Sequence, residues 1–255
     1  PAFLSMSIAF SISLIVDMPV DKITFLFNLP ISCNNSTFVR RIYLDVIGRL
    51  PQPDEVRAFL HDRSPDKRAQ LIDRLVDSSD FADWWAMKWA DVLRVDNQKL
   101  TPQVTVAITR WLRRQMAENV PYDRFASEIV TVRGNTRSET PAAIYTVLKS
   151  PEELARSVSQ LFLGVRIECA QCHHHPFEKW AQRDYFALAG FFTGVKRAGA
   201  PGGGQKITDV AGADLKHPRS GLPVPAAGLG GDPARPGHNG AIGEQRTKRR
   251  PTFSR

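Results

Sequence analysis

Helix start signals recur along much of the chain and restrict its fold more than any other sequence feature. In Ser150-Pro151-Glu152-Glu153, the serine hydroxyl can accept a bond from the first turn, the proline occupies a position that needs no donor, and Glu153 can reach back to the cap. Pro53 and the Ser64-Pro65-Asp66 segment mark two earlier starts. We therefore predict a succession of helices over about residues 36–193.

Apolar side chains recur at helical spacing between these start signals. Phe38, Ile42 and Val46 fall on one face of the first predicted helix. The same pattern predicts further helices over about residues 53–60, 66–76, 81–93, 103–116, 151–163 and 184–192, and a short one around Phe125. Gly164 is placed to end the helix that begins at Pro151. The predicted fold class is therefore mostly α, a compact multi-helix domain.

The composition changes after Gly194, where glycine and proline recur, as in Pro201-Gly202-Gly203-Gly204. Such a segment buries too little apolar surface to offset its conformational entropy. We expect a Gly/Pro-rich irregular C-terminal tail. The predicted organisation is an apolar N-terminal segment at residues 1–35, a helical domain at 36–197 and a Gly/Pro-rich basic tail or linker at 198–255.

The first segment contains a run, residues 1–16, without a charged side chain. It is too short for a stable membrane span and about long enough for the core of a signal peptide, although no basic leader or small-residue cleavage site accompanies it. A buried strand or helix, or the end of a fragment, would explain the run equally well. Under the signal-peptide interpretation the protein is secreted or periplasmic.

The charge of the chain is basic. Its 255 residues include 34 Lys and Arg against 26 Asp and Glu, which gives a net charge of +8. Much of the excess lies near the end of the chain, at Arg246, Lys248, Arg249, Arg250 and Arg255. A basic tail can attract nucleic acid, but no base-stacking motif or recognition-helix pattern accompanies this one. We therefore expect no nucleic-acid partner.

Residues 169–173, Cys-Ala-Gln-Cys-His, carry the strongest functional signal. Cys-X-X-Cys-His is the attachment sequence for c-type haem. Cys169 and Cys172 would form thioethers with the haem, and His173 would be an axial ligand of its iron. The third cysteine of the chain, Cys33, lies far upstream, so no disulfide framework is predicted. Haem attachment of this kind normally takes place outside the cytoplasm, which agrees with export.

A second axial ligand is not evident, because all four methionines precede the motif. His217 could supply one if the tail folds back. Aromatic residues that follow the motif could flank a haem, although such spacing is more often ordinary core, and core is what we expect for most of them: Phe177, Trp180, Tyr185, Phe186, Phe191 and Phe192.

Two other interpretations of the motif stay open. Cys169 and Cys172 could hold zinc together with His173 or His175, and with His217, although the histidine spacing is irregular for zinc. The two cysteines could instead form a disulfide, although the chain lacks the βαβ pattern of thioredoxin-like sites.

Four segments carry a family resemblance: residues 38–51, 89–94, 119–123 and 163–177. They resemble the cytochrome-like domain of unknown function found in large secreted planctomycete proteins, and the resemblance covers about residues 30–230. In that family the domain usually precedes a second domain of unknown function, and some members add a separate cytochrome c domain. The resemblance implies a secreted, cytochrome-like role, and we expect the chain to be a fragment.

The predicted function is a cytochrome-like electron-transfer module that works with a redox partner protein or with a missing C-terminal domain. The alternatives are a non-redox structural module with a zinc or disulfide site, and part of a larger enzyme whose catalytic residues lie in the absent region. The chain contains no Gly-rich phosphate loop, no Gly-X-Ser-X-Gly elbow and no His-Glu-X-X-His motif. The sequence therefore leaves enzymatic activity undecided.

Overall fold

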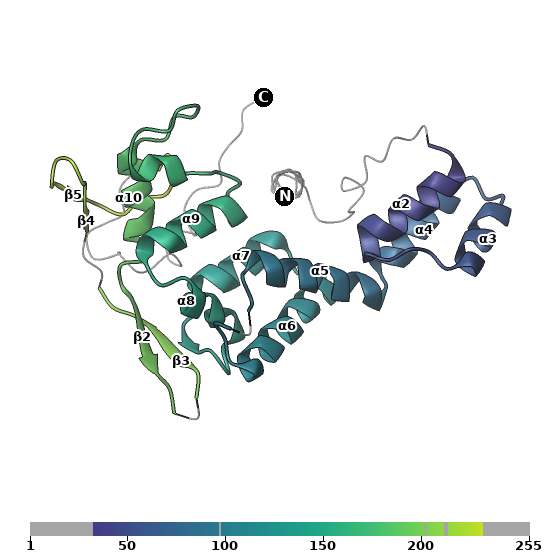
Figure 1. The fold of residues 1–255 in the computed structure, drawn as a ribbon, viewed down its shortest axis with the longest axis horizontal. Helices are drawn as coiled ribbons and strands as arrows, with labels where there is room; N and C mark the ends of the chain where they lie inside the picture. The colour runs from purple at the N-terminus through teal and green to yellow at the C-terminus, as the bar shows by residue number, and fades with distance from the viewer. Residues whose placement is uncertain (1–32, 97, 202, 212–213, 232–255) are drawn as a thin grey trace.

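The computed structural model describes residues 33–96, 98–201, 203–211 and 214–231 (Figure 1). Its α-helices are α2 (Asn35–Ile47), α3 (Pro53–His61), α4 (Lys67–Val76), α5 (Ser79–Val92), α6 (Pro102–Ala117), α7 (Tyr122–Thr131), α8 (Ile144–Val147), α9 (Pro151–Phe162) and α10 (Gln182–Gly190). Two 3-10 helices, η2 (Thr140–Ala143) and η3 (Glu168–Gln171), lie between them. The mostly α prediction is confirmed. The uncharged run at residues 1–16 and the basic end of the tail lie outside the described residues.

The predicted helix start at Ser150 is confirmed in detail. The Ser150 hydroxyl accepts a bond from the Glu153 amide at 3.1 Å, and the Glu153 carboxylate accepts from the amides of Lys149 at 2.8 Å and Ser150 at 3.3 Å. These backbone bonds, chiefly the one from Lys149, lower the pKa of Glu153. Pro53 is likewise the first residue of α3.

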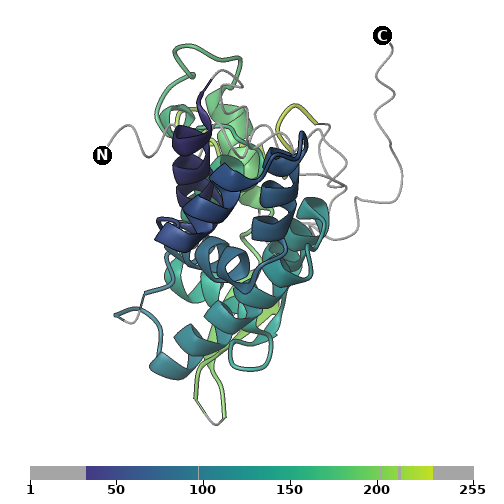
Figure 2. The same ribbon diagram turned by 90° about the vertical axis from the view of Figure 1, so that its right-hand side faces the viewer.

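The helices pack around two cores that share α5. The first core contains Phe38, Ile42 and Val46 of α2, with residues of α3, α4 and the start of α5. The second core is built from the rest of α5 through α10 and includes Leu112 and Ile129, which are at most 1% exposed. Figure 1 shows α2, α3 and α4 at one end of the molecule, and Figure 2 shows the same cluster from that end.

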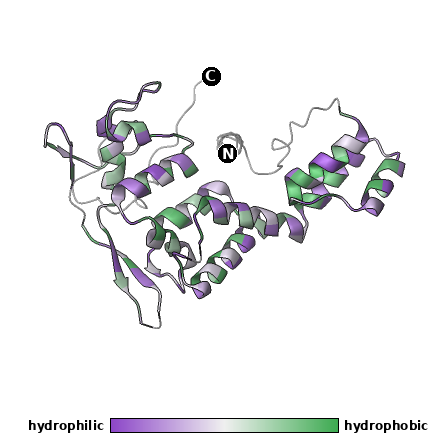
Figure 3. Ribbon diagram, viewed as in Figure 1, coloured by the Kyte–Doolittle hydropathy of each residue, from purple (hydrophilic) through white to green (hydrophobic). Residues whose placement is uncertain are grey.

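Each longer helix is amphipathic. Figure 3 shows hydrophobic and hydrophilic stretches alternating along the helices, as expected when one face of each helix packs on a core. Within the described residues, no helix is long and apolar enough to cross a membrane.

The described strands are β1 (Gly134–Asn135), β2 (Val195–Gly199), β3 (Gln205–Asp209), β4 (Leu215–Lys216) and β5 (Pro223–Val224). β3 lies between β1 and β2 in an antiparallel sheet, with Ile207 opposite Gly134 and Arg197. The Ile207 side chain is fully buried in the second core.

All of these strands except β1 lie after Gly194, where the sequence predicts a change to an irregular tail. The described part of this segment is largely irregular, but β3 contributes to the core. Residues 205–209, Gln-Lys-Ile-Thr-Asp, contain neither glycine nor proline, so the residues that disfavour regular structure flank the strand and do not interrupt it.

A second hairpin, β4–β5, packs against α10 (Figure 1). Val224 and Ala227 form a small apolar cluster with Ala187 of α10. The contact is close, because a Cβ atom added at Gly190 would lie 3.0 Å from the Cβ atom of Ala226. The hairpin therefore fixes the position of His217, which lies in its turn.

Candidate functional site

The Cys-X-X-Cys-His segment lies in the connection between α9 and α10. Gly164 ends α9 in the left-handed region with φ of 67°, as the sequence predicts. Ser159 then holds the chain after the turn, since its carbonyl accepts from the Val165 amide at 3.0 Å and its hydroxyl donates to the Val165 carbonyl at 2.7 Å. Ile167, which is 1% exposed, anchors the start of η3 in the second core.

The two cysteines and His173 lie on one tight turn. The amides of Cys172 and His173 both donate to the Cys169 carbonyl at 3.3 Å. Ala170 between the cysteines is fully buried, whereas Cys169, Cys172 and His173 are exposed. Both thiols are free. The turn therefore presents two thiols and one imidazole to solvent while its own backbone is anchored below.

Helix α10 supports this turn from beneath. Gln182, which is 5% exposed, donates from Nε2 to the Gln171 carbonyl at 2.8 Å. Tyr185 is fully buried, and its hydroxyl donates to the Glu152 carbonyl of α9 at 3.3 Å. Burial raises the pKa of Tyr185 to about 12, so the phenol stays protonated and remains a donor.

The hydrogen bond of His173 defines its chemical form. Its Nδ1 lies 2.7 Å from the carbonyl oxygen of His174. A carbonyl can only accept, so Nδ1 carries the hydrogen and the lone pair of the neutral ring lies on Nε2. A histidine that ligates a metal through Nε2 has the same arrangement, with the other ring nitrogen donating to a backbone carbonyl.

His175 has the opposite arrangement. Its Nδ1 accepts from the amides of Phe177 at 3.3 Å and Glu178 at 3.0 Å, so the hydrogen of the neutral ring lies on Nε2. Its own amide donates to the Trp180 carbonyl at 2.9 Å and closes the loop. His175 therefore holds the loop that follows the Cys-X-X-Cys-His turn.

His217 makes the same type of turn in the β4–β5 hairpin. Its Nδ1 accepts from the amides of Arg219 at 3.3 Å and Ser220 at 3.4 Å, and its amide donates to the Leu222 carbonyl at 2.8 Å. Both histidines precede a proline, which has no amide to donate. The repeated His-Pro dipeptide is the sequence signal for this shared role, which sequence reasoning missed.

The structure does not assemble the predicted zinc ligands. Among the residues that it describes, no group of three or more His, Cys, Asp or Glu side chains is placed to hold a metal ion. Cys169, Cys172 and His173 share a turn, whereas His175 and His217 use Nδ1 within their own turns.

The aromatic residues after the motif divide into core and surface. Tyr185, Phe191 and Phe192 are buried in the second core, as expected for most of this set. Phe177, in contrast, is 92% exposed in the loop held by His175. Leu163, just before the turn, is 49% exposed. Apolar surface is therefore available in the segments on either side of the motif.

The fold and the site define a helical domain that presents a dithiol and a histidine on a turn between two packed helices. Residues 27–197 match the model of the PSCyt2 family, described as a protein of unknown function (DUF1549), and the chain belongs to this family. The match confirms the predicted membership of a family of domains of unknown function. No curated protein and no solved structure matches the chain.

Proposed function

We propose that the chain is a cytochrome-like electron-transfer module that attaches haem c through Cys169 and Cys172, with His173 as the axial ligand. When bound, the haem would supply an iron centre that accepts and releases one electron. The observation that carries the proposal is the form of His173, whose Nδ1 donates to a carbonyl and leaves Nε2 for ligation on the turn that bears two free thiols.

The residues around the turn suit this chemistry. The thiols are exposed, so a maturation enzyme could reach them. Ala170 and Gln182 fix the backbone between and behind the thiols, which limits the conformations that the attachment turn can adopt. Leu163 and Phe177 offer apolar surface beside the turn. A haem needs such surface because its macrocycle is flat and apolar.

Haem attachment explains the donor set better than zinc does. Structural zinc is usually held by four N or S ligands placed together, and among the described residues no group of even three such side chains is placed to hold a metal ion. The proposed fourth ligands, His175 and His217, hold their own turns through Nδ1. Haem attachment requires only the two thiols and the one imidazole that the turn presents. Because such attachment occurs outside the cytoplasm, we propose a secreted or periplasmic protein with a redox partner protein or a further domain.

The test is expression with c-type haem maturation machinery. We expect haem that stays with the chain after denaturation, together with a c-type absorption spectrum. The double variant Cys169→Ser/Cys172→Ser should lose covalent haem, whereas Cys33→Ser, which removes the cysteine outside the motif, should keep it. A parent chain that matures without haem, while a known cytochrome c matures in the same cells, would overturn the proposal.

His173 needs a separate measurement, because its variant tests ligation more than attachment. His173→Ala should shift or weaken the haem absorption bands and leave the far-ultraviolet circular dichroism close to that of the parent, since the side chain is exposed. An unchanged haem spectrum would show that His173 is not an axial ligand.

A further inference from the structure

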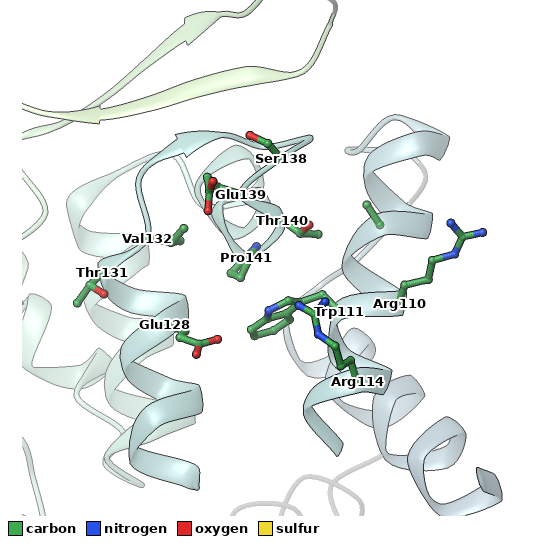
Figure 4. Close-up of a pocket in the computed structure, with 11 residues that line it drawn as sticks. Arg110, Trp111, Arg114, Glu128, Thr131, Val132, Ser138, Glu139, Thr140 and Pro141 are labelled. Atoms are coloured by element: carbon green, nitrogen blue, oxygen red, sulfur yellow. The ribbon is translucent and has the colours of Figure 1, made fainter. Parts of the chain in front are cut away.

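A pocket of about 590 Å³ lies between α6, α7 and the segment at residues 138–141 (Figure 4). Its volume falls in the range of small-molecule sites. None of its lining residues belongs to the Cys-X-X-Cys-His turn or to the adjoining loops. The pocket is therefore a second candidate site, and ligand binding there does not depend on haem attachment at the turn.

The apolar part of the pocket is a preformed surface. Trp111 of α6 is 7% exposed and stacks on Phe125 of α7, with ring centroids 5.5 Å apart. Val132 and Pro141 also line the pocket. Because Trp111 is held by its stacking partner, it offers a fixed contact for an apolar group at little entropic cost.

The charged side chains of the pocket lie on different walls, with the positive group on one side and the negative groups on the others. Figure 4 shows Arg114 of α6 and Glu128 of α7 reaching into the pocket from opposite sides, with Glu139 at a third edge and the Arg110 guanidinium directed away. Gln115 orients Glu128, since its Nε2 donates to the Glu128 carboxylate at 3.4 Å. Within the described part of the chain, no ion pair joins Arg114 to either carboxylate.

We propose that this pocket binds a small zwitterion of the α-amino acid class. The ligand carboxylate would accept from the Arg114 guanidinium, its ammonium group would donate to Glu128 and Glu139, and its apolar side chain would contact Trp111. A ligand with only a carboxylate would leave both glutamates unpaired and be repelled by them, and a ligand with only an ammonium group would leave the Arg114 guanidinium unpaired. A ligand with both charges pairs with both walls through charge-assisted hydrogen bonds.

Three probes that share the leucine side chain and differ in their charged groups test the proposal on the unaltered chain. L-leucine carries both charges, N-acetyl-L-leucine only the carboxylate, and L-leucinamide only the ammonium group. In a titration followed by ¹⁵N NMR, leucine should shift the Trp111 indole resonance and bind about tenfold or more tightly than either single-charge probe. The Trp111→Phe variant identifies that resonance by its loss.

Variants of the two walls locate the binding. Arg114→Gln and Glu128→Gln should each weaken leucine binding by about tenfold or more. Arg113→Gln is the matched control, because Arg113 is the preceding residue of α6 and pairs with Asp83 outside the pocket. This control should leave leucine binding unchanged.

Leucine that produces no saturable shift up to millimolar concentration, or N-acetyl-L-leucine that binds as tightly as leucine, would exclude a zwitterion site. An equal loss of binding in Arg113→Gln would place the binding elsewhere. The comparison of the three probes decides the proposal even where a variant fails to fold.

Discussion

A position can require glycine for two reasons, a left-handed backbone conformation or close contact with a neighbouring side chain. Three glycines of this chain differ in these two respects. Gly48 ends α2 with φ of 71°, and a side chain there would also overlap the Trp84 ring. Gly221, in the β4–β5 turn, has φ of 68° but faces open space. Gly228 has neither constraint. The first position therefore combines backbone strain with a clash, the second has strain alone, and the third has neither.

Alanine at these positions should lower the free energy of unfolding in the same order. We expect a change within about 0.5 kcal/mol for Gly228→Ala, a loss of about 1 kcal/mol for Gly221→Ala, and a loss of about 2–4 kcal/mol for Gly48→Ala because the clash adds to the strain. Urea unfolding monitored by circular dichroism measures all three. Equal losses at Gly48 and Gly221 would mean that Trp84 moves aside without cost.

A single carboxylate gives part of the fold its pH dependence. The Arg49 guanidinium, bonded to Glu55 at 2.9 Å, lowers the pKa of Glu55 from 4.5 to about 2. A lowered pKa in the folded state means that the stabilisation is complete above the unfolded value of 4.5 and is lost as the pH falls through about 2. The Arg49 side chain is 39% exposed, so solvent screening keeps the effect to about 1 kcal/mol or less.

Glu55→Gln should therefore be less stable than the parent near neutral pH, and the difference should shrink as the pH falls from about 4.5 towards about 2. Urea unfolding at a series of pH values measures this convergence. Asp54→Asn is the control, because the Asp54 side chain is 89% exposed and its partner Arg57 is one turn away on the same helix. A constant difference between Glu55→Gln and the parent at every pH would contradict the mechanism.

Among the elements, helix starts were the most predictable from sequence, because local chemistry determines them. The five residues from Lys149 to Glu153 contain every group that the cap uses. The β1–β3 pairing could not be inferred in this way, since Gly134 and Ile207 are far apart in the chain. The same limit applies to the site: the shared turn of Cys169 and His173 follows from their spacing, whereas its support by Gln182 depends on tertiary packing.

The loop after the Cys-X-X-Cys-His turn should depend on the acceptor at His175. His175→Ala removes the acceptor for the Phe177 and Glu178 amides, so those amides should exchange with solvent about fivefold faster, equivalent to the loss of about 1 kcal/mol from the turn. His175→Asn should restore much of the protection, because a short side-chain oxygen before proline can accept the same bonds. Hydrogen exchange followed by NMR measures both.

The control for this loop is His174→Ala. The His174 side chain is exposed, and its carbonyl, which accepts from His173, is retained in the variant. Exchange at Phe177 and Glu178 should then match that of the parent. Equal exchange in His175→Ala and the parent would show that the loop is held by other contacts.

At the scale of the whole molecule, β3 ties the segment after residue 200 to the helical core. Ile207→Ala should lower the free energy of unfolding by about 2–5 kcal/mol, because the side chain is fully buried and its removal leaves a cavity. Lys206→Ala, on the exposed face of the same strand, should change it by less than about 0.5 kcal/mol. Thermal or urea unfolding compares the two. Equal effects would mean that β3 is not part of the cooperative fold.

The shared helix α5 has a consequence for how the molecule loses its structure. Phe81 of α5 belongs to one core and Ala86 of α5 belongs to the other, and among the described helices only α5 contributes to both. If one core unfolded alone, α5 would be left with part of its apolar surface exposed, because Trp85 and Trp89 pack against different cores. The stability of each core is therefore coupled to that of the other through α5. Trp89 of α5 also stacks on Phe162 of α9, with ring centroids 6.3 Å apart, so the same helix connects the first core with the helix that precedes the cysteine turn.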